Sequence, residues 1–254
     1  MMQKKFRIIP SVLYKNGSVV KSLQFSNHRI VGDLPSTMRV FSRRQADELI
    51  IFDLDASETK AIDWEMVDTC VENCNMPLTY GGGVDNFDVA QELIARGFDK
   101  ISINSALFEK PDEVTKIAKR IGSSSLVAVV DIVKINDNIQ LRKNMGQQIV
   151  EDVKWENFGN YASDLGVGEI VINSIDNDGQ MGGYDFSQLS ELTNNTQLPT
   201  LISGGCSGAS CIKNAYFNGF DGAVMSSIFL WKGDSIPSLK QELKGQVPVR
   251  EVII

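Results

Sequence analysis

The stretch LTYGG at residues 78–82 returns 123 residues later as LISGG at residues 201–205. Each copy is a short apolar run that ends in a glycine pair, the pattern typical of a buried strand followed by a tight turn. Two more matches share this spacing to within one residue: GFD at 97–99 with 219–221, and DLD at 53–55 with DND at 176–178. Three matches in one order indicate two duplicated halves.

Eight short apolar runs divide the chain, and amphipathic stretches such as residues 87–96 and 111–121 lie between them. Continuous apolar runs are typical of parallel strands buried on both faces. Eight strand-then-helix units predict an α/β fold, a (β/α)8 TIM barrel with internal half-barrel duplication, as one domain over residues 1–254. Residues 134–142, with Asn136-Asp137-Asn138 at the centre, predict a hairpin after the fifth strand. The eight runs are residues 6–9, 49–52, 78–80, 101–103, 126–130, 170–172, 200–202 and 223–225.

Composition excludes several classes of protein. The 254 residues carry a formal net charge of -7 with no basic stripe, which argues against a nucleic-acid partner. No apolar run approaches the length of a membrane span, and no export signal is recognised, so a cytoplasmic protein with reduced thiols is expected. With one histidine, no metal site is expected, and no cofactor. Cys70 and Cys74 are interpreted as packing residues, and Cys206 as a small side chain.

Small and polar residues follow four of the predicted strands, at the end of a barrel where active sites lie. Glycines let a phosphate approach backbone N–H groups, and Asn and Ser add donors. The duplication gives two such sites, which predicts an elongated phosphorylated small molecule with a charged group at each end; the alternative is that the glycines only make tight turns. The candidate phosphate-binding residues are Gly82, Gly83, Asn104 and Ser105 in the first half, and Asp178, Gly179, Gly204, Gly205, Ser226 and Ser227 in the second.

The motifs RIIP at 7–10, GSVVK at 17–21, YGGG at 80–83, SIN at 102–104 and SIDNDG at 174–179 occur in this order. With them the chain resembles, over essentially its whole length, the HisF family, the cyclase subunit of imidazole glycerol phosphate synthase. The resemblance implies a barrel that receives ammonia from a glutaminase subunit. The ammonia then crosses the barrel to a bisphosphate substrate on the far face.

The resemblance also implies two catalytic aspartates, after strands one and five. Asp131 matches the second, and Lys21 matches a lysine near the first, so both are candidate catalytic residues. Leu13 stands where the first aspartate is expected, and a leucine can neither accept nor donate a proton. The chain's own cyclase activity is therefore in doubt, and a structural role is the alternative for Asp131.

RIIPSVL at 7–13 and FSNHRIVGD at 25–33 resemble a second, WbuZ-type branch of the family, associated with glycosyl amidation. Members of that branch accompany a glutaminase subunit and a separate sugar amidotransferase in surface-polysaccharide synthesis. The resemblance to this branch implies that the barrel passes ammonia onward, for which Leu13 is no obstacle.

Four charged residues precede the predicted strands and match the family's ammonia gate: Arg7, Glu48, Lys100 and Glu169. They should converge at the amino-terminal end of the barrel, where two acids and two bases can close a salt-bridge ring. Asp99 matches a family contact to the glutaminase. The alternative for the ring is a layer that only stabilises the barrel.

Three hypotheses stay open from the sequence. The first is an ammonia-conducting synthase subunit for the amidation of a surface-polysaccharide sugar. The second is a working cyclase that forms imidazole glycerol phosphate and AICAR. The third is a non-catalytic barrel that only binds and activates a glutaminase.

Overall fold

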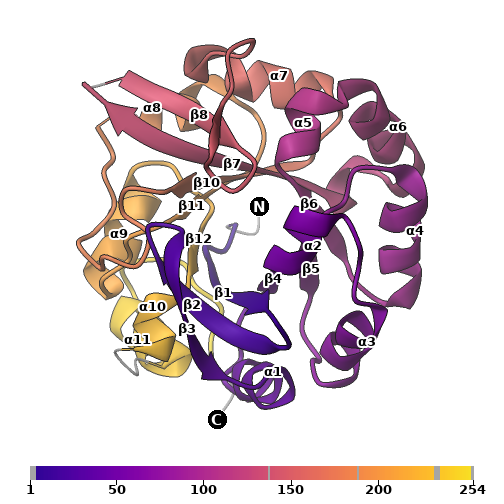
Figure 1. The fold of residues 1–254 in the computed structure, drawn as a ribbon. Coiled ribbons are helices and arrows are strands. Elements are labelled where there is room, and N and C mark those ends of the chain that lie inside the picture. Colours follow the sequence, from indigo (N-terminus) through magenta and orange to yellow (C-terminus); the bar gives the residue numbers. More distant parts are fainter. Residues whose placement is uncertain (1–3, 137, 188, 232–234, 253–254) are drawn as a thin grey trace.

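A computed structural model describes residues 4–136, 138–187, 189–231 and 235–252. Eight parallel strands close into a barrel (Figure 1), because each strand pairs with the next along the chain, β7 pairs β10, and β12 returns to β1. The predicted α/β barrel is confirmed. Its strands are β1 (Arg7–Lys15), β4 (Leu49–Asp53), β5 (Leu78–Gly81), β6 (Lys100–Ile103), β7 (Leu126–Ile135), β10 (Glu169–Ser174), β11 (Thr200–Ser203) and β12 (Gly222–Met225).

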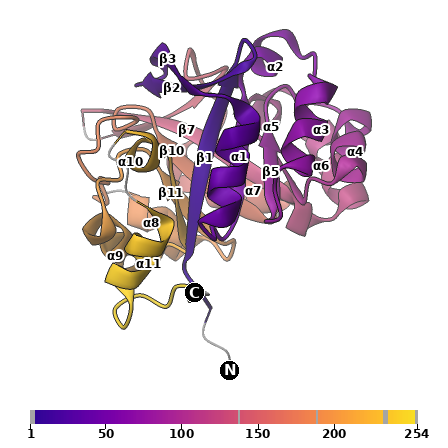
Figure 2. The same ribbon diagram turned by 90° about the horizontal axis from the view of Figure 1, so that it is seen from below.

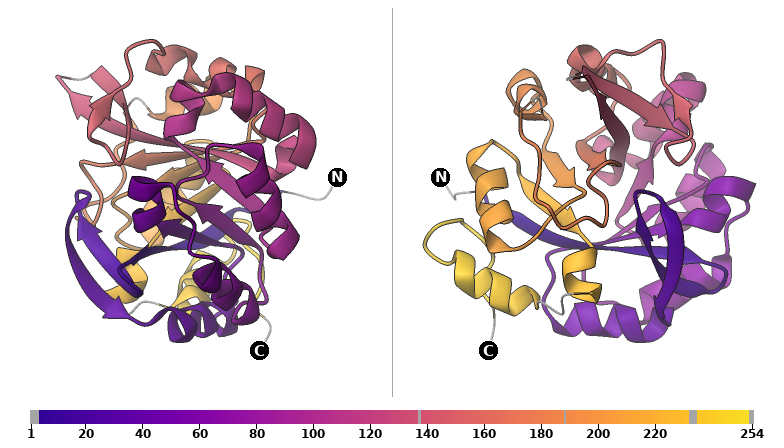
Figure 3. Two further views of the ribbon diagram at one scale, coloured as in Figure 1. Left: turned by 45° about the vertical axis from the view of Figure 1, so that its right-hand side comes forward. Right: turned by 60° about the vertical axis from the view of Figure 1, so that its left-hand side comes forward.

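Helices surround the barrel on the outside (Figures 1 and 3). Side-chain caps start several of them: Asp33, Asp53, Asp63 and Asn86 each accept a backbone N–H of the first turn. In the part of the chain described, no helix is both long and apolar enough to cross a membrane. The helices are α1 (Leu34–Arg43), α2 (Leu54–Thr59), α3 (Trp64–Glu72), α4 (Phe87–Arg96), α5 (Ser105–Glu109), α6 (Pro111–Ile121), α7 (Phe158–Asp164), α8 (Leu189–Asn195), α9 (Ala209–Phe217), α10 (Ser227–Leu230) and α11 (Ile236–Leu243), with 3-10 turns at Ser123–Ser125 and Trp155–Asn157.

Alternation along the strands separates the barrel into an outer and an inner core. On β1, Ile8 packs in the large cluster that the helices cover, whereas Ile9 belongs to a separate cluster inside the barrel. The inner cluster contains Ile9, Ile50, Val127, Val129, Val171, Leu201 and Val224, and all of them are at most 5% exposed. The barrel interior is therefore a packed apolar layer, with polar residues before and after it on the same strands.

Two hairpins project from the carboxyl-terminal end of the barrel. The predicted hairpin after β7 is confirmed: β8 (Asn138–Lys143) pairs back on β7, with Ile135 opposite Asn138, and β9 (Gln148–Ile149) continues the sheet. Its expected turn residue Asp137 lies outside the described residues. The second hairpin, which was not predicted, consists of β2 (Ser18–Leu23) and β3 (Ser26–Gly32). Figure 2 places it at the end opposite both termini.

The duplication extends to individual hydrogen bonds. Asp99 Oδ2 accepts the Leu78 N–H at 2.9 Å, and Asp221 Oδ2 accepts the Thr200 N–H at 2.9 Å. In return, the Asp99 N–H donates to the Leu78 carbonyl, and Asp221 N–H to that of Thr200. Both aspartates come from the repeated GFD motif, so the motif fixes the start of β5 and of β11 in the same way.

Candidate active site and ion-pair ring

A cavity of about 230 Å³ opens at the carboxyl-terminal end of the barrel, which we call the mouth. The strand ends and the two hairpins line it. All the candidate catalytic and phosphate-binding residues from the sequence lie on its wall: Lys21, Asp131, Gly82, Gly83, Asn104, Ser105, Asp178, Gly179, Gly204, Gly205, Ser226 and Ser227. Because loops from both halves line the same cavity, it can present two equivalent glycine loops to one ligand.

Asp131 lies on β7 at the base of the mouth and is 6% exposed. Two amides hold its carboxylate: Asn173 Nδ2 donates to Oδ1 at 3.0 Å, and Asn104 Nδ2 to Oδ2 at 3.2 Å. Burial raises the pKa of Asp131 to about 7; the Asn173 hydrogen bond opposes this rise, and the charge of Asp178 adds to it. A carboxyl group with this pKa exchanges its proton near neutral pH, which suits a general acid or base.

Two apolar side chains line the mouth on the side of β1 and β4, across the barrel from Asp131. Leu13 on β1 is in register with Phe52 on β4, and both line the mouth; β1 is four strands around the barrel from β7, and β4 is three. The polar neighbours of Leu13 are engaged elsewhere, since Tyr14 Oη donates to Asp63 at 3.4 Å and Lys15 Nζ to Glu58 at 3.0 Å. Neither residue brings a carboxylate to the place of the missing aspartate.

Lys21 and Asp178 form a pair that joins the β2 strand to the loop after β10. Lys21 is 2% exposed, and its Nζ lies 3.1 Å from Asp178 Oδ1. Ser22 Oγ donates to Asp178 Oδ2 at 2.9 Å. The sequence grouped Asp178 with the phosphate-binding residues, but its carboxylate repels an anion and its N–H donates to the Ile175 carbonyl. Asp178 therefore positions Lys21 rather than offering a donor itself.

The two glycine loops have backbones that only glycine fits. Gly82 has φ +131°, and a Cβ on it would lie 2.3 Å from the Asp53 carbonyl oxygen; Gly205 has φ +104°, and its Cβ would lie 2.4 Å from that of Gly183. The hydroxyls beside the two loops differ. Ser105 Oγ accepts the Asn144 N–H at 3.0 Å, whereas Ser226 Oγ is buried and has no hydrogen-bond partner within the described chain.

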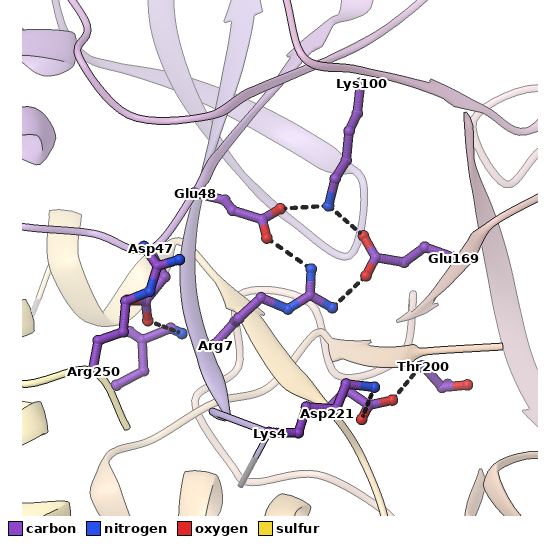
Figure 4. A network of polar contacts seen from close by, with 10 residues as sticks. Lys4, Arg7, Asp47, Glu48, Lys100, Glu169, Thr200, Asp221 and Arg250 are labelled. Carbon is purple, nitrogen blue, oxygen red and sulfur yellow. Dashed lines mark hydrogen bonds and ion pairs between the residues drawn. The ribbon is translucent and has the colours of Figure 1, made fainter. Parts of the chain in front are cut away.

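The opposite end of the barrel carries a closed ring of ion pairs, formed by Arg7, Glu48, Lys100 and Glu169 (Figure 4). Arg7 Nη1 lies 2.7 Å from Glu48 Oε1, and Lys100 Nζ lies 2.9 Å from Glu48 and 3.0 Å from Glu169. A direct Arg7–Glu169 pair completes the ring. The four residues predicted to converge thus lie together, directly below the apolar layer.

The ring balances its own charges. Burial alone would raise the pKa of Glu48, but the charges of Arg7 and Lys100 outweigh it and lower that pKa. Burial would likewise lower the pKa of Arg7, and its pairs with Glu169 and Glu48 instead raise it. The ring therefore favours the charged forms of Glu48 and Arg7.

Several residues of the mouth were not found from the sequence. Asn173 is the register partner of Asp131 across β7 and β10, strands 42 residues apart, so no local pattern connects them. Phe52 and Met145 line the cavity, but as apolar residues they gave no chemical signal. The one available clue was position, because Asn173 directly precedes the SIDNDG motif at a strand end.

Comparisons with known proteins show the family to which the chain is similar. Residues 7–234 match the family described as "Histidine biosynthesis protein". The chain is 36% identical to the putative imidazole glycerol phosphate synthase subunit hisF2 of Campylobacter jejuni, over 95% of this chain and 96% of that one. It is 34% identical to a putative HisF subunit of Leptospira interrogans (90% and 91% covered) and 32% identical to the HisF subunit of Francisella philomiragia (97% and 98%).

Proposed function

This chain belongs to the histidine biosynthesis protein family, as a HisF-type barrel, and from that premise we propose that it is an ammonia-using synthase subunit of the imidazole glycerol phosphate synthase type. Ammonia from a glutaminase subunit would enter at the ring and react with a phosphorylated small molecule in the mouth. One observation carries the proposal: the barrel has a closed ring of ion pairs at one end and, at the other, a titratable carboxyl group in a cavity that two glycine loops line.

The interior supports a passage for ammonia rather than for ions. Between the ring and Asp131, the buried inward-facing residues described are the apolar side chains of the inner cluster and the small polar Ser11, Thr79 and Ser102. Neutral ammonia crosses such a layer at low cost, whereas an unpaired ammonium ion loses its hydration there. The ring then acts as a gate that excludes charged solutes by being charge-balanced itself.

The glutaminase would dock on the face around the ring. Asp99 is exposed beside Lys100, and its carboxylate also holds the Leu78 N–H. Reversing its charge would therefore disturb the fold as well as docking. Asp99→Asn keeps an oxygen for the Leu78 N–H and removes only the charge. We expect this variant to fold normally and to bind the glutaminase more weakly, as a rim charge pair does.

The names of the relatives favour imidazole glycerol phosphate as the product. Asp131 is the only carboxyl group at the base of the mouth with a pKa near neutrality among the described residues, so it would act as both acid and base. The test supplies the bisphosphate substrate of the cyclase with ammonium chloride and follows imidazole glycerol phosphate by mass spectrometry. We expect product from the wild type and none from Asp131→Asn.

Leu13 favours a second candidate, in which the nitrogen goes to a different acceptor, such as a surface-polysaccharide sugar precursor handled with a sugar amidotransferase. A leucine at this position cannot supply the second proton transfer that the cyclase chemistry of the family implies. Complete absence of imidazole glycerol phosphate, from a protein that still binds phosphate and a glutaminase, would select this candidate.

Phosphate binding tests the site independently of the reaction. We expect two inorganic phosphate ions per chain, one at each glycine loop, measured by calorimetry or by soaked crystals. A protein that binds no phosphate at either loop would contradict the elongated ligand and leave the glycines as tight turns only.

A further inference from the structure

Two cysteines lie against each other directly behind the second glycine loop. Cys206 follows Gly205 and lines the mouth, and Cys211 lies in the first turn of α9. The Gly208 carbonyl oxygen accepts the Cys211 N–H at 3.1 Å, and the two cysteine side chains are 5% and 9% exposed. Cys206 Sγ also lies 3.8 Å from the Gly208 carbonyl oxygen. The pair is outside the proposed catalytic groups, although it shares a loop with them.

Donors converge on the sulfur of Cys211. Ser207 Oγ lies 2.9 Å from Cys211 Sγ. The first turn of a helix adds a favourable field for an anion. Together, the Cys206 thiol first, these donors lower the pKa of Cys211, because they stabilise the thiolate more than burial opposes it.

The other cysteine pair has no such surroundings. Cys70 and Cys74 lie one turn apart, on α3 and just after its end, and burial raises the pKa of both thiols. The neighbours of Cys70 Sγ include the Met66 sulfur at 3.5 Å. The two cysteine pairs of the chain therefore have different surroundings.

We propose that Cys211 is a reactive thiolate and that Cys206 resolves it, so that peroxide converts the pair into a reversible disulfide that weakens anion binding at the second glycine loop. The Cys211 thiolate attacks one peroxide oxygen, forming a sulfenic acid and releasing hydroxide. The Cys206 thiol then displaces water from the sulfenic acid, and the S–S bond forms. Two electrons pass from the two sulfurs to the peroxide, and a thiol reductant reverses the change.

The loop geometry links this bond to the anion site. The Gly205 carbonyl, one residue before Cys206, accepts the Gly183 N–H at 2.8 Å. Gly183 also adjoins Cys211, whose Sγ would lie 3.7 Å from a Cβ at that position. Drawing Cys206 toward α9 therefore moves the backbone of Gly205 and its contact with Gly183. The effect on binding rests on the proposed function, because that proposal provides the anion site, whereas the thiol chemistry stands without it.

The test treats the full-length reduced protein with hydrogen peroxide and maps the products by mass spectrometry. We expect a Cys206–Cys211 disulfide to form before any change at Cys70 or Cys74. Cys206→Ser should stop at a sulfenic acid on Cys211 that dimedone traps, and Cys211→Ser should not react at the low dose. Cys70→Ser is the matched control and should behave as the wild type does.

Calorimetry with inorganic phosphate measures the coupling. We expect the oxidised protein to bind phosphate at this loop about tenfold more weakly, the loss of roughly one good hydrogen bond, and dithiothreitol to restore the binding. Oxidation that begins at Cys70 or Cys74, or a disulfide with unchanged phosphate binding, would overturn the inference. A reduced protein that binds no phosphate while the disulfide still forms would overturn the anion site and the coupling to it, and would leave the reactive pair established.

Discussion

The two ends of the barrel are built from the same strands, yet they treat polar groups in opposite ways. At the ring, Arg7 and Glu48 lie two residues before the inward-facing Ile9 and Ile50, and every charge has a partner. At the mouth, Asp131 lies two residues after Val129, and Ser226 Oγ has no partner in the described chain. Side chains two residues apart on a strand point to the same face, so all of these side chains point into the barrel.

The polar groups of the ring thus all have partners, whereas at the mouth at least one buried polar atom has none among the described residues. Charged groups that all pair with one another leave no donor or acceptor for a ligand. A buried polar group without a partner costs free energy, and such groups persist where a ligand supplies the missing partner. The ring therefore suits a gate, and the mouth suits a binding site.

The largest expected effect concerns the mouth. Leu13→Asp restores a carboxylate opposite Asp131, and we expect imidazole glycerol phosphate formation with free ammonia to rise about 10²- to 10⁴-fold, the usual value of one acid–base group. The asparagine of Leu13→Asn has the same shape as the aspartate but cannot exchange a proton, so this variant should keep the wild-type rate. Equal rates for the two variants would mean that proton transfer at this position is not what limits the reaction.

Breaking the ion-pair ring should lower the stability of the protein. Lys100→Ala leaves Glu48 and Glu169 with one cation, and we expect the free energy of unfolding to fall by about 3 kcal/mol. In the complex it should also raise the ratio of glutamate released to product formed, as ammonia escapes. Lys116→Ala removes an exposed ion pair with Glu113 and should change neither quantity. A ratio that stays near one in Lys100→Ala would identify the ring as a stabilising layer only.

The sequence predicted the strands well because burial on both faces leaves continuous apolar runs, as in residues 126–130. It did not predict β3, whose residues Ser26–Gly32 are nearly all exposed and so carry no alternation. The ring was predicted because its members precede strands and match a family pattern. The Asn173–Asp131 contact was not, since the register between β7 and β10 is fixed by closure of the whole barrel.

The contributions of Asp131 at the mouth and of Glu48 in the ring to stability should depend on pH with opposite signs. The folded-state pKa of Asp131 is raised from 3.8 to about 7, so its contribution to stability is present below pH 3.8 and is lost as the pH rises toward 7. The pKa of Glu48 is lowered, so its contribution is present above its ordinary value of 4.5 and is lost as the pH falls through the lowered value.

Unfolding by urea at several pH values measures this contrast. Between pH 5 and 7 we expect the free energy of unfolding of the wild type to fall by about 2 kcal/mol relative to that of Asp131→Asn. The difference for Glu48→Gln should stay constant over the same range and change only in acid. A flat difference for Asp131→Asn would show that its carboxyl group titrates as an ordinary, hydrated one does.

The smallest effect concerns one loop of the mouth. Gly205→Ala places a methyl group against the Gly183 carbonyl oxygen at a φ of +104°, so the loop must shift and its N–H groups leave their positions. We expect inorganic phosphate to bind about tenfold more weakly at this loop, the loss of about one hydrogen bond, while the loop at Gly82 keeps its affinity. Gly182→Ala is the matched control, because nothing lies within 4 Å of its Cβ. Equal weakening at both loops would mean that the two halves do not bind independently, and an unchanged affinity at Gly205 would place the second ion elsewhere in the mouth.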